Sequence, residues 1–309
     1  MRKTKIWITG ANGMVGRALV KKVEKNKKYE VLKTSRKNFD QTNQQKTENW
    51  IKKNKPDIII ITSALVGGIQ LNSKISSEFL YQNSMIELNI IRAAQKSNCK
   101  KIVFLGASCM YPKDAAQPFK EESIFDGKVE ETNEGYAVAK ILGLKFLELI
   151  NKEYGTSHLS IIPAASYGPN DCYDENRNHV IPALISKIYN AKIKKLENIS
   201  LWGTGNAKRE FIHVDDMADG ILYIIEKYTD TKPINLGTGE EVSIKQLADI
   251  IKKIIGYDGK IIFDNKNPDG ISRKILSNNK VKKLKWKKKI SLKKGLEDSI
   301  NEFIEMTKH

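Results

Sequence analysis

The chain has 309 residues, enough for one or two domains with a large buried core, and its 40% hydrophobic and 29% charged residues are typical of a globular protein rather than a disordered one. No apolar run approaches the roughly 20 residues that a membrane helix needs, and the N-terminus enters a strand without a signal-peptide pattern. The net charge of +17 suggests nucleic acid as a possible partner. However, the lysines are spread along the chain, and the one dense cluster, at 280–289, lacks the interleaved aromatic residues of a nucleic-acid-binding groove. We therefore expect the lysines to form a solvated surface.

Strand and helix patterns alternate through the first half of the chain. Apolar, β-branched runs predict strands at 5–9, 29–34, 57–62, 101–105 and 159–163. Apolar positions with a helical period predict helices at 14–24, 44–54, 76–96 and 136–153. This alternation predicts an α/β fold with a Rossmann-type doubly wound parallel sheet, covered on both faces. In such a fold the ligand crevice lies beyond the carboxyl ends of the strands.

The pattern loosens after residue 163. Turn clusters at YGPND (167–171) and WGTGNAKRE (202–210) are followed by further elements, with helices predicted at 214–227, 244–255 and 292–306 and strands at 233–236 and 260–263. We therefore expect two domains. A cofactor-binding Rossmann domain spans 1–165, with returning segments near 210–240, and a smaller, partly interleaved α+β domain takes up the remainder of 166–309 and closes over the crevice.

A glycine-rich loop, ITGANGMVG at 8–16, follows the first strand and opens the first helix. Gly10 permits a tight turn, Gly13 allows backbone N–H groups to approach a pyrophosphate, and Gly16 allows close helix–strand packing. The helix N-terminus favours phosphate. The spacing G-x-x-G-x-x-G in this context predicts dinucleotide binding, the alternative being a plain strand–helix turn. The expected cofactor contacts are Gly10, Asn12, Gly13, Met14, Val15, Gly16, Ser63 and Ala64.

The second predicted strand leads into VLKTSRKNFD, where an NAD-binding fold is expected to place an acidic residue for the ribose hydroxyls. Ser35 and Arg36 stand there instead, and a guanidinium can pair bidentately with a 2′-phosphate. This favours NADP(H), although Arg36 is also compatible with an ordinary surface charge. Asp40 comes slightly later and keeps NAD possible, so both residues remain candidate cofactor contacts.

The segment EGYAVAK, 134–140, contains Tyr-x-x-x-Lys. On a helix Tyr136 and Lys140 share one face, and a nearby ammonium stabilises a phenolate and lowers the pKa of a tyrosine from its usual value of about 10. The pair therefore predicts a proton donor for a carbonyl that receives hydride. Alone the pattern is frequent by chance. Its weight comes from the cofactor loop and the strands that precede it.

With these features the chain resembles the extended short-chain dehydrogenase/reductases that act on sugar nucleotides, and within them the GDP-L-fucose synthase family. The resemblance covers nearly the whole chain and rests on TGANGMVG, VGGI at 66–69, YQN at 81–83, SCMYPK, TNEGYAVAK, NHVIPAL at 178–184, WGTGNAKREFIHVDD at 202–216 and PDGISRK at 268–274. It implies an NADPH-dependent reductase of the 4-keto group of a GDP-4-keto-sugar, a 6-deoxyhexose or a heptose, with 3,5-epimerase capability and no metal.

The resemblance also implies roles for individual residues. Cys109 is expected to be the epimerisation base and His179 its acid partner, because the pKa of a thiol falls near cations and a histidine can donate a proton at neutral pH. The other expected site residues are Tyr136, Lys140 and Ser108 in catalysis, Lys140 and His179 at the cofactor, Lys187, Arg209 and Lys274 at the GDP diphosphate, and Trp202 at the guanine or sugar. Without the resemblance, Cys109 reads as an inert thiol, His179 as a helix-start residue and Trp202, at even odds, as core.

Three positions depart from the family pattern. Ala107 replaces a serine whose hydroxyl usually bonds the substrate carbonyl, Leu65 stands where lysine is common, and Ala165 stands where asparagine is usual. Adjacent strand residues point to opposite sides, so Ser108 is not expected to replace the lost donor without a local twist. Loss of one donor to a developing oxyanion can cost about 10²-fold in rate.

These departures leave alternatives open. One is a C4 reductase only, acting on a GDP-heptose derivative, with epimerisation lost; another is a non-catalytic NADP-binding regulator. A 4-epimerase or dehydratase of the wider family is disfavoured because it has no use for a Cys–His pair. A basic protein that binds nucleic acid is the last alternative, and it ranks below the enzyme and the regulator.

The location and assembly are expected from two features. Three cysteines, Cys99, Cys109 and Cys172, are too few for a disulfide framework and predict reduced thiols in the cytoplasm, with neither membrane nor nucleic acid as a partner. The resemblance implies a homodimer built from the helices at 76–96 and 136–153.

Overall fold

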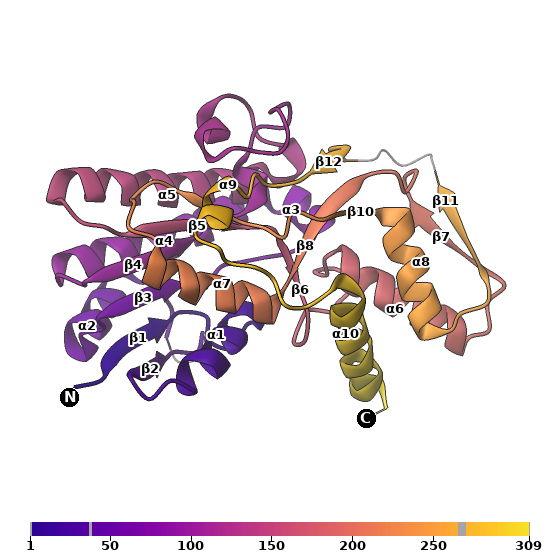
Figure 1. Ribbon diagram of the computed structural model, residues 1–309, viewed down its shortest axis with the longest axis horizontal. Coiled ribbons are helices and arrows are strands. Elements are labelled where there is room, and N and C mark those ends of the chain that lie inside the picture. The colour runs from indigo at the N-terminus through magenta and orange to yellow at the C-terminus, as the bar shows by residue number, and fades with distance from the viewer. Residues whose placement is uncertain (1, 37–38, 265–269, 309) are drawn as a thin grey trace.

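The computed structural model describes residues 2–36, 39–264 and 270–308, and its ribbon is drawn in Figure 1. Residues 268 and 269, which begin the PDGISRK segment, lie outside the described residues. The larger half of the fold holds the N-terminus and a broad sheet, and the smaller half carries the C-terminus (Figure 1).

A six-stranded parallel sheet forms the centre of the larger half, in the order β2-β1-β3-β4-β5-β9. The strands are β1 Thr4–Ile8, β2 Tyr29–Lys33, β3 Ile58–Ile61, β4 Lys101–Leu105, β5 Leu159–Pro163 and β9 Ile234–Leu236. Each was expected to within about one residue. Buried apolar side chains dominate every strand except the edge strand β2, because a parallel sheet that is covered on both faces has no solvated side.

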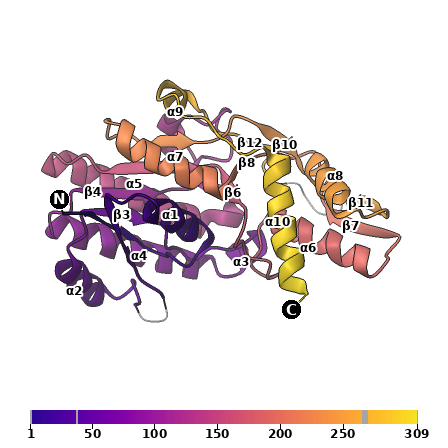
Figure 2. The same cartoon turned by 60° about the horizontal axis from the view of Figure 1, so that its bottom comes forward.

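Helices cover both faces of this sheet, which confirms the doubly wound fold (Figures 1 and 2). The helices α1 (Met14–Glu24) and α7 (Val214–Lys227) pack together on one face, and α2 (Gln44–Asn54), α4 (Ser76–Lys96) and α5 (Glu134–Tyr154) form the other layer. Helix α7 and strand β9 come from late in the sequence but join the larger half. The division of the chain at residue 165 stays a prediction.

The direction of the crossovers reverses at β1, since β2 pairs with one edge of this strand and β3 with the other. In doubly wound folds the ligand binds beyond the carboxyl ends of the strands at this switch point. Gly10, after β1, and Ser63, after β3, meet there: a Cβ on Gly10 would lie 2.9 Å from the Ser63 Cα.

Several elements of the smaller half were not predicted from the sequence: strands β6 Ala165–Tyr167, β7 Asn198–Trp202, β8 Lys208–His213, β10 Glu241–Ser243 and β12 Arg273–Lys274, and helix α6 Val180–Ile193. Strand β11 Lys260–Asp264 and the helices α8 Ile244–Ile255 and α10 Leu292–Thr307 were expected to within about one residue. Strand β8 is central and pairs with β6, β10 and β12, while β7 pairs with β11. Apolar side chains of α6, α8 and α10 form a second buried cluster.

Reading WGTGNAKRE as one turn cluster was wrong at both of its ends. Trp202 ends β7 and Lys208 begins β8, so only residues 203–207 form the turn. Gly203 and Gly205 have positive φ values of 76° and 77°, which a turn this tight requires. The short elements α3 (Ile69–Lys74) and α9 (Asn279–Lys283) and the 3-10 turns η1 (Ser108–Met110), η2 (Glu121–Phe125) and η3 (Glu131–Asn133) were also not predicted.

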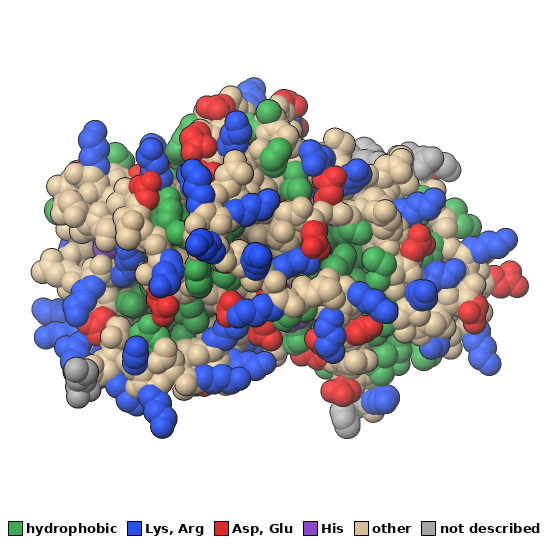
Figure 3. All heavy atoms as spheres, in the orientation of Figure 1, with side chains coloured by type: hydrophobic (Ala, Val, Ile, Leu, Met, Phe, Trp, Pro, Cys, Tyr) green, Lys and Arg blue, Asp and Glu red, His purple; other side chains and the backbone are tan. Residues whose placement is uncertain are grey.

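The surface carries the excess of basic residues as expected. On the face shown in Figure 3, Lys and Arg side chains are scattered among neutral and acidic ones and do not gather into one patch. Among the described residues, none of the helices combines the length and the apolar character that crossing a membrane requires.

Candidate active site

The glycine loop after β1 has the shape that a dinucleotide phosphate requires. Gly10 has φ +61°, and the N–H of Gly13 donates to the Gly10 carbonyl at 2.9 Å to close the turn. A Cβ on Gly16 would lie 2.2 Å from the same carbonyl oxygen, so only glycine lets α1 approach the strand. The first turn of α1 has no acidic residue to compete with an anion. Asn12, Met14 and Val15 belong to the same loop and helix start.

The loop after β2 separates the roles of Arg36 and Asp40. The Asp40 carboxylate accepts hydrogen bonds from the N–H and the hydroxyl of Thr42, at 3.0 and 2.7 Å. The hydroxyl bond is the main reason why the pKa of Asp40 is lowered. Asp40 is thus engaged in its own turn, whereas Arg36 is exposed. This arrangement suits a 2′-phosphate better than a bare ribose.

Tyr136 and Lys140 lie together on α5, as the spacing predicted. The Lys140 Nζ is 5.7 Å from the centroid of the Tyr136 ring and 5.0 Å from that of Phe104 on β4. Phe79 from α4 packs edge-on against Tyr136, with centroids 6.3 Å apart. Lys140 is only 3% exposed and forms an ion pair with Glu87 of α4.

The expected direction of the Tyr136 pKa was wrong for the protein without ligands. The Lys140 ammonium does lower the pKa, but burial raises it more, and the net pKa of Tyr136 is about 12. The phenol is therefore fully protonated at neutral pH, which suits a proton donor.

Cys109 shows the same competition between burial and charge. Its thiol lies near the ammonium groups of Lys274 and Lys140, both of which lower its pKa, yet burial raises the pKa to about 11. The expectation that nearby cations give a reactive thiolate is therefore wrong, because burial outweighs both of them.

Ser108 does not lie on an extended strand, so the alternation argument applied to it was wrong. The chain leaves β4 at Leu105, Ala107 is still extended with φ −151°, and Ser108 begins the 3-10 turn η1. This turn contacts α5. It supplies the local twist that a replacement for the missing hydroxyl of Ala107 requires.

His179 stands at the start of α6, where its backbone is extended. The side chain reaches the surface, but the surrounding protein desolvates the imidazole and lowers its pKa. The preceding residues pack on the VGGI segment, since the N–H of Gly68 donates to the Arg177 carbonyl and a Cβ on Gly68 would lie 2.4 Å from the Asn178 oxygen. The start of α6 therefore adjoins the loop that follows β3.

Two of the expected diphosphate contacts lie side by side. Lys274 of β12 pairs in register with Arg209 of β8, which places both cations on neighbouring strands. The Lys274 ammonium is 2.6 Å from a Glu130 carboxylate oxygen. Burial raises the pKa of Glu130, but Lys274 outweighs burial and the net pKa is lowered, so the pair is ionised. Lys187, two turns into α6, is exposed.

Trp202 and Ala165 are exposed, whereas Leu65 is half-buried. Trp202 is 61% exposed at the end of β7, which excludes a core role. Ala165 begins β6 and is exposed. The backbone of Leu65 is fixed by Asn83 of the YQN segment, whose side chain accepts from the Leu65 N–H at 2.7 Å and donates to the Leu65 carbonyl at 3.1 Å.

Sequence reasoning missed Glu87, Glu130 and the structural use of Asn83. Each acts on a partner from a distant segment, and no local spacing reveals such a partner. Asn83 and Glu87 are one helical turn apart on α4, and this spacing was the one available indication that both face inward.

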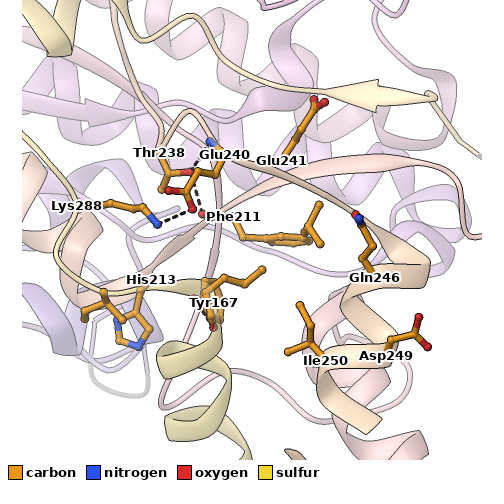
Figure 4. Close-up of a pocket in the computed structure, with 13 residues that line it drawn as sticks. Tyr167, Phe211, His213, Thr238, Glu240, Glu241, Gln246, Asp249, Ile250 and Lys288 are labelled. Carbon is orange, nitrogen blue, oxygen red and sulfur yellow. Dashed lines mark hydrogen bonds and ion pairs between the residues drawn. The ribbon is translucent and has the colours of Figure 1, made fainter. Parts of the chain in front are cut away.

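A separate cavity of about 470 Å³ lies in the smaller half, between β8, α8 and the chain that leads into α10 (Figure 4). Tyr167 and Phe211 line it, and Lys288 pairs with Glu240 at its rim. Among the described residues, no candidate site residue named above lines this cavity. His213 borders it, but the imidazole caps α7 by accepting from the Asp215 N–H, in keeping with a scaffold role.

Comparisons with known proteins agree with the fold and the site. The NAD dependent epimerase/dehydratase family matches residues 6–237. The chain is 41% identical to a GDP-L-fucose synthase of Sinorhizobium fredii, over 97% of this chain and 95% of that protein. The structure of a GDP-6-OMe-4-keto-L-xylo-heptose reductase from C. jejuni superposes with a TM-score of 0.92 at 31% identity, covering 99% of each chain. A GDP-mannoheptose C4 reductase from Campylobacter jejuni with NADP bound gives a TM-score of 0.88 at 32% identity, covering 98% of this chain and 99% of that one.

The cofactor loop generates a prediction with a matched control. Gly10 and Gly155 have φ values of +61° and +63°, so alanine at either costs about 1–2 kcal/mol of backbone strain. A Cβ at Gly155 meets nothing within 4 Å, whereas at Gly10 it meets Ser63. We expect Gly10→Ala to weaken NADPH binding at least about tenfold, since even 1.4 kcal/mol of misfit has that effect, and Gly155→Ala to leave it unchanged. Fluorescence titration with NADPH measures both, and equal affinities would contradict the assignment.

Proposed function

The chain belongs to the NAD dependent epimerase/dehydratase family and is homologous to GDP-L-fucose synthases, and on this premise we propose that it is an NADP-dependent oxidoreductase that reduces the 4-keto group of a GDP-4-keto-sugar. The observation that carries the proposal is the contact between the half-buried Tyr136 and the buried Lys140 on α5, a helix that packs against η1 at the carboxyl end of β4. The Tyr136 hydroxyl and the Lys140 ammonium therefore lie near the carboxyl end of β4, the edge of the sheet at which a doubly wound fold binds its ligand.

The residues present fit NADP(H). Gly13 leaves room for a pyrophosphate at the start of α1, Gly10 and Gly16 allow the tight turn and the close packing of that loop, and Arg36 is exposed beside the turn that occupies Asp40. Ser63 and Ala64 complete the edge beside Gly10. When bound, NADPH supplies a hydride to carbon 4 of the sugar. Proton donation and substrate binding are carried out by the side chains of the protein itself.

Tyr136 supplies the proton. As carbon 4 is reduced, its carbonyl oxygen becomes basic and takes the proton from the Tyr136 hydroxyl, which leaves a phenolate. A pKa of about 12 keeps this proton in place until then. Lys140 stabilises the phenolate afterwards and, by analogy with the family, holds the cofactor ribose. Phe79 and Phe104 exclude water from the pair.

The GDP moiety is assigned to the smaller half. Arg209 and Lys274 lie on adjacent strands and carry the charge that a diphosphate needs, with Lys187 as a third cation. Trp202 is exposed and available to stack on the guanine or to wall the sugar. Glu130 already pairs with Lys274, so the diphosphate has to compete with this carboxylate.

Epimerisation at carbons 3 and 5 is proposed for Cys109 as base and His179 as acid, with Ser108 as the nearby hydroxyl. The second candidate function is a C4 reductase only, acting on a GDP-heptose derivative. One observation favours it: burial raises the pKa of Cys109 to about 11, which disfavours the thiolate that epimerisation needs. The C. jejuni structural relatives are named as reductases of GDP-heptoses.

The direct test of function is NADPH oxidation with a panel of GDP-4-keto-sugars. We expect turnover by the wild-type protein and a loss of about 10²- to 10⁴-fold in kcat for Tyr136→Phe, because a general acid contributes about that much. NADPH affinity should be unchanged. Tyr154→Phe, at the exposed end of the same helix, serves as the control. Absence of NADPH oxidation with every sugar, or a fully active Tyr136→Phe, would contradict the proposal.

The same reaction in heavy water separates the two candidate functions. If both epimerisations are retained, as we propose, mass spectrometry finds two solvent deuterons on sugar carbons in the product, and Cys109→Ser removes them while NADPH is still consumed. A product without carbon-bound deuterium identifies a reductase only.

The chain is also proposed to form a cytoplasmic homodimer through α4 and α5. The three cysteines are free, as expected in a reducing compartment. Val138, Leu142 and Leu149 are 39%, 41% and 46% exposed and recur at helical spacing on α5, beside the 37% exposed Leu80 of α4. This apolar face is suited to a second copy of itself.

The assembly is tested by light scattering on the purified protein. We expect twice the chain mass of 35.0 kDa for the wild type and a monomer for Leu142→Asp, because a buried carboxylate at a symmetric interface meets its own copy. Ile193→Asp, on α6 and 62% exposed, should remain dimeric. A monomeric wild type would refute the dimer, as would a dimeric Leu142→Asp.

A further inference from the structure

One buried acid has no part in the reaction described so far. Glu87 lies in the middle of α4 and is fully buried. One of its carboxylate oxygens is 2.7 Å from the Lys140 ammonium, and the two side chains are 1% and 4% exposed. An isolated charge at this depth would be unstable, so each group depends on the other.

The helix that carries Lys140 has a recess for this carboxylate. Gly143 follows Lys140 by one turn of α5, and a Cβ there would lie 2.4 Å from Glu87 Oε2 and 2.8 Å from the Phe104 ring. Any larger residue at 143 would displace the carboxylate or the ring. Glu87, Gly143 and Phe104 together enclose the ammonium from the side opposite the solvent.

We propose that Glu87 is a positioning residue for the reduction: its carboxylate fixes the Lys140 side chain beside Tyr136 and keeps it charged in a buried site, so that an ammonium is in place to stabilise the phenolate when the proton leaves. This inference rests on the proposed function, since it concerns the same proton transfer.

The charges around Lys140 explain the effect. Among the described residues, Tyr136 from its own helix, Cys109 from η1 and Glu87 from α4 act on the ammonium. Burial lowers the pKa of Lys140, but these neighbours raise it, Glu87 most, and the net pKa is raised. Burial also raises the pKa of Glu87, to about 7, although Lys140 lowers it. Without the Glu87 carboxylate, burial acts on Lys140 with less opposition, so its pKa falls and the ammonium that stabilises the phenolate is lost at a lower pH.

The experiment is the pH dependence of kcat/KM for NADPH-dependent reduction by Glu87→Gln. We expect the alkaline limb, where Lys140 loses its proton, to move to lower pH by about one unit, which is the size of shift that a neighbouring charge produces. The KM for NADPH should change little and kcat should fall. Glu87→Asp keeps the negative charge but holds it farther from Lys140. The alkaline limb of this variant should therefore lie between those of the wild type and Glu87→Gln. Glu78→Gln, on the exposed first turn of α4, is the control and should match the wild type.

A second readout needs no substrate. Carbon-13 NMR of lysine-labelled protein, with the Lys140 signal identified by its absence in Lys140→Met, should give a lower Lys140 pKa in Glu87→Gln than in the wild type. If Glu87→Gln does not fold, the same comparison is made with Glu87→Asp. An unshifted Lys140 titration overturns this inference and leaves the proposed function standing. A wild type that reduces no GDP-4-keto-sugar overturns the function instead, whatever the titration shows.

Discussion

The site depends on one buried ammonium. Lys140 is enclosed by Glu87, Phe104 and the ring of Tyr136, and desolvating such a cation costs several kcal/mol unless a carboxylate compensates for it. The compensation comes from α4, so the ion pair also sets how α4 and α5 lie against each other. Gly135 supports the same contact at the start of α5, where its N–H donates to the Ser76 hydroxyl and a Cβ would lie 2.0 Å from the Ser76 carbonyl oxygen. The helices that we assign to a dimer interface thus also position the acid.

Burial acts in opposite directions on the two chemical steps. It keeps Tyr136 and Cys109 in their neutral forms, with pKa values of about 12 and 11. A reduction needs a protonated phenol, whereas an epimerisation needs a thiolate. The site therefore favours proton donation to a carbonyl over proton abstraction from carbon. This asymmetry gives the reductase-only alternative its physical basis.

Local sequence patterns were sufficient to predict the central sheet, the cofactor loop and the Tyr–Lys pair. The apolar strands, the spacing of Gly10, Gly13 and Gly16, and the Tyr136–Lys140 pair are all visible within short segments, because each expresses a local geometric requirement. The signs of the pKa shifts were not predictable in this way, since the nearest charges favour ionisation and only the packed structure reveals how strongly burial opposes them. The role of Glu87 was not predicted either, because its partner, Lys140, lies on another helix. The strands around β8 are short and partly polar, and they pair with segments that are distant in the sequence, so local patterns did not predict them.

The central claim is that Tyr136 remains an un-ionised acid in the resting protein, despite the cation beside it. Carbon-13 NMR titration of tyrosine-labelled wild-type protein tests this most directly, with Tyr136→Phe identifying the signal. The account predicts that Tyr136 titrates above the ordinary tyrosine value of about 10. A Tyr136 that ionises near neutral pH would contradict it.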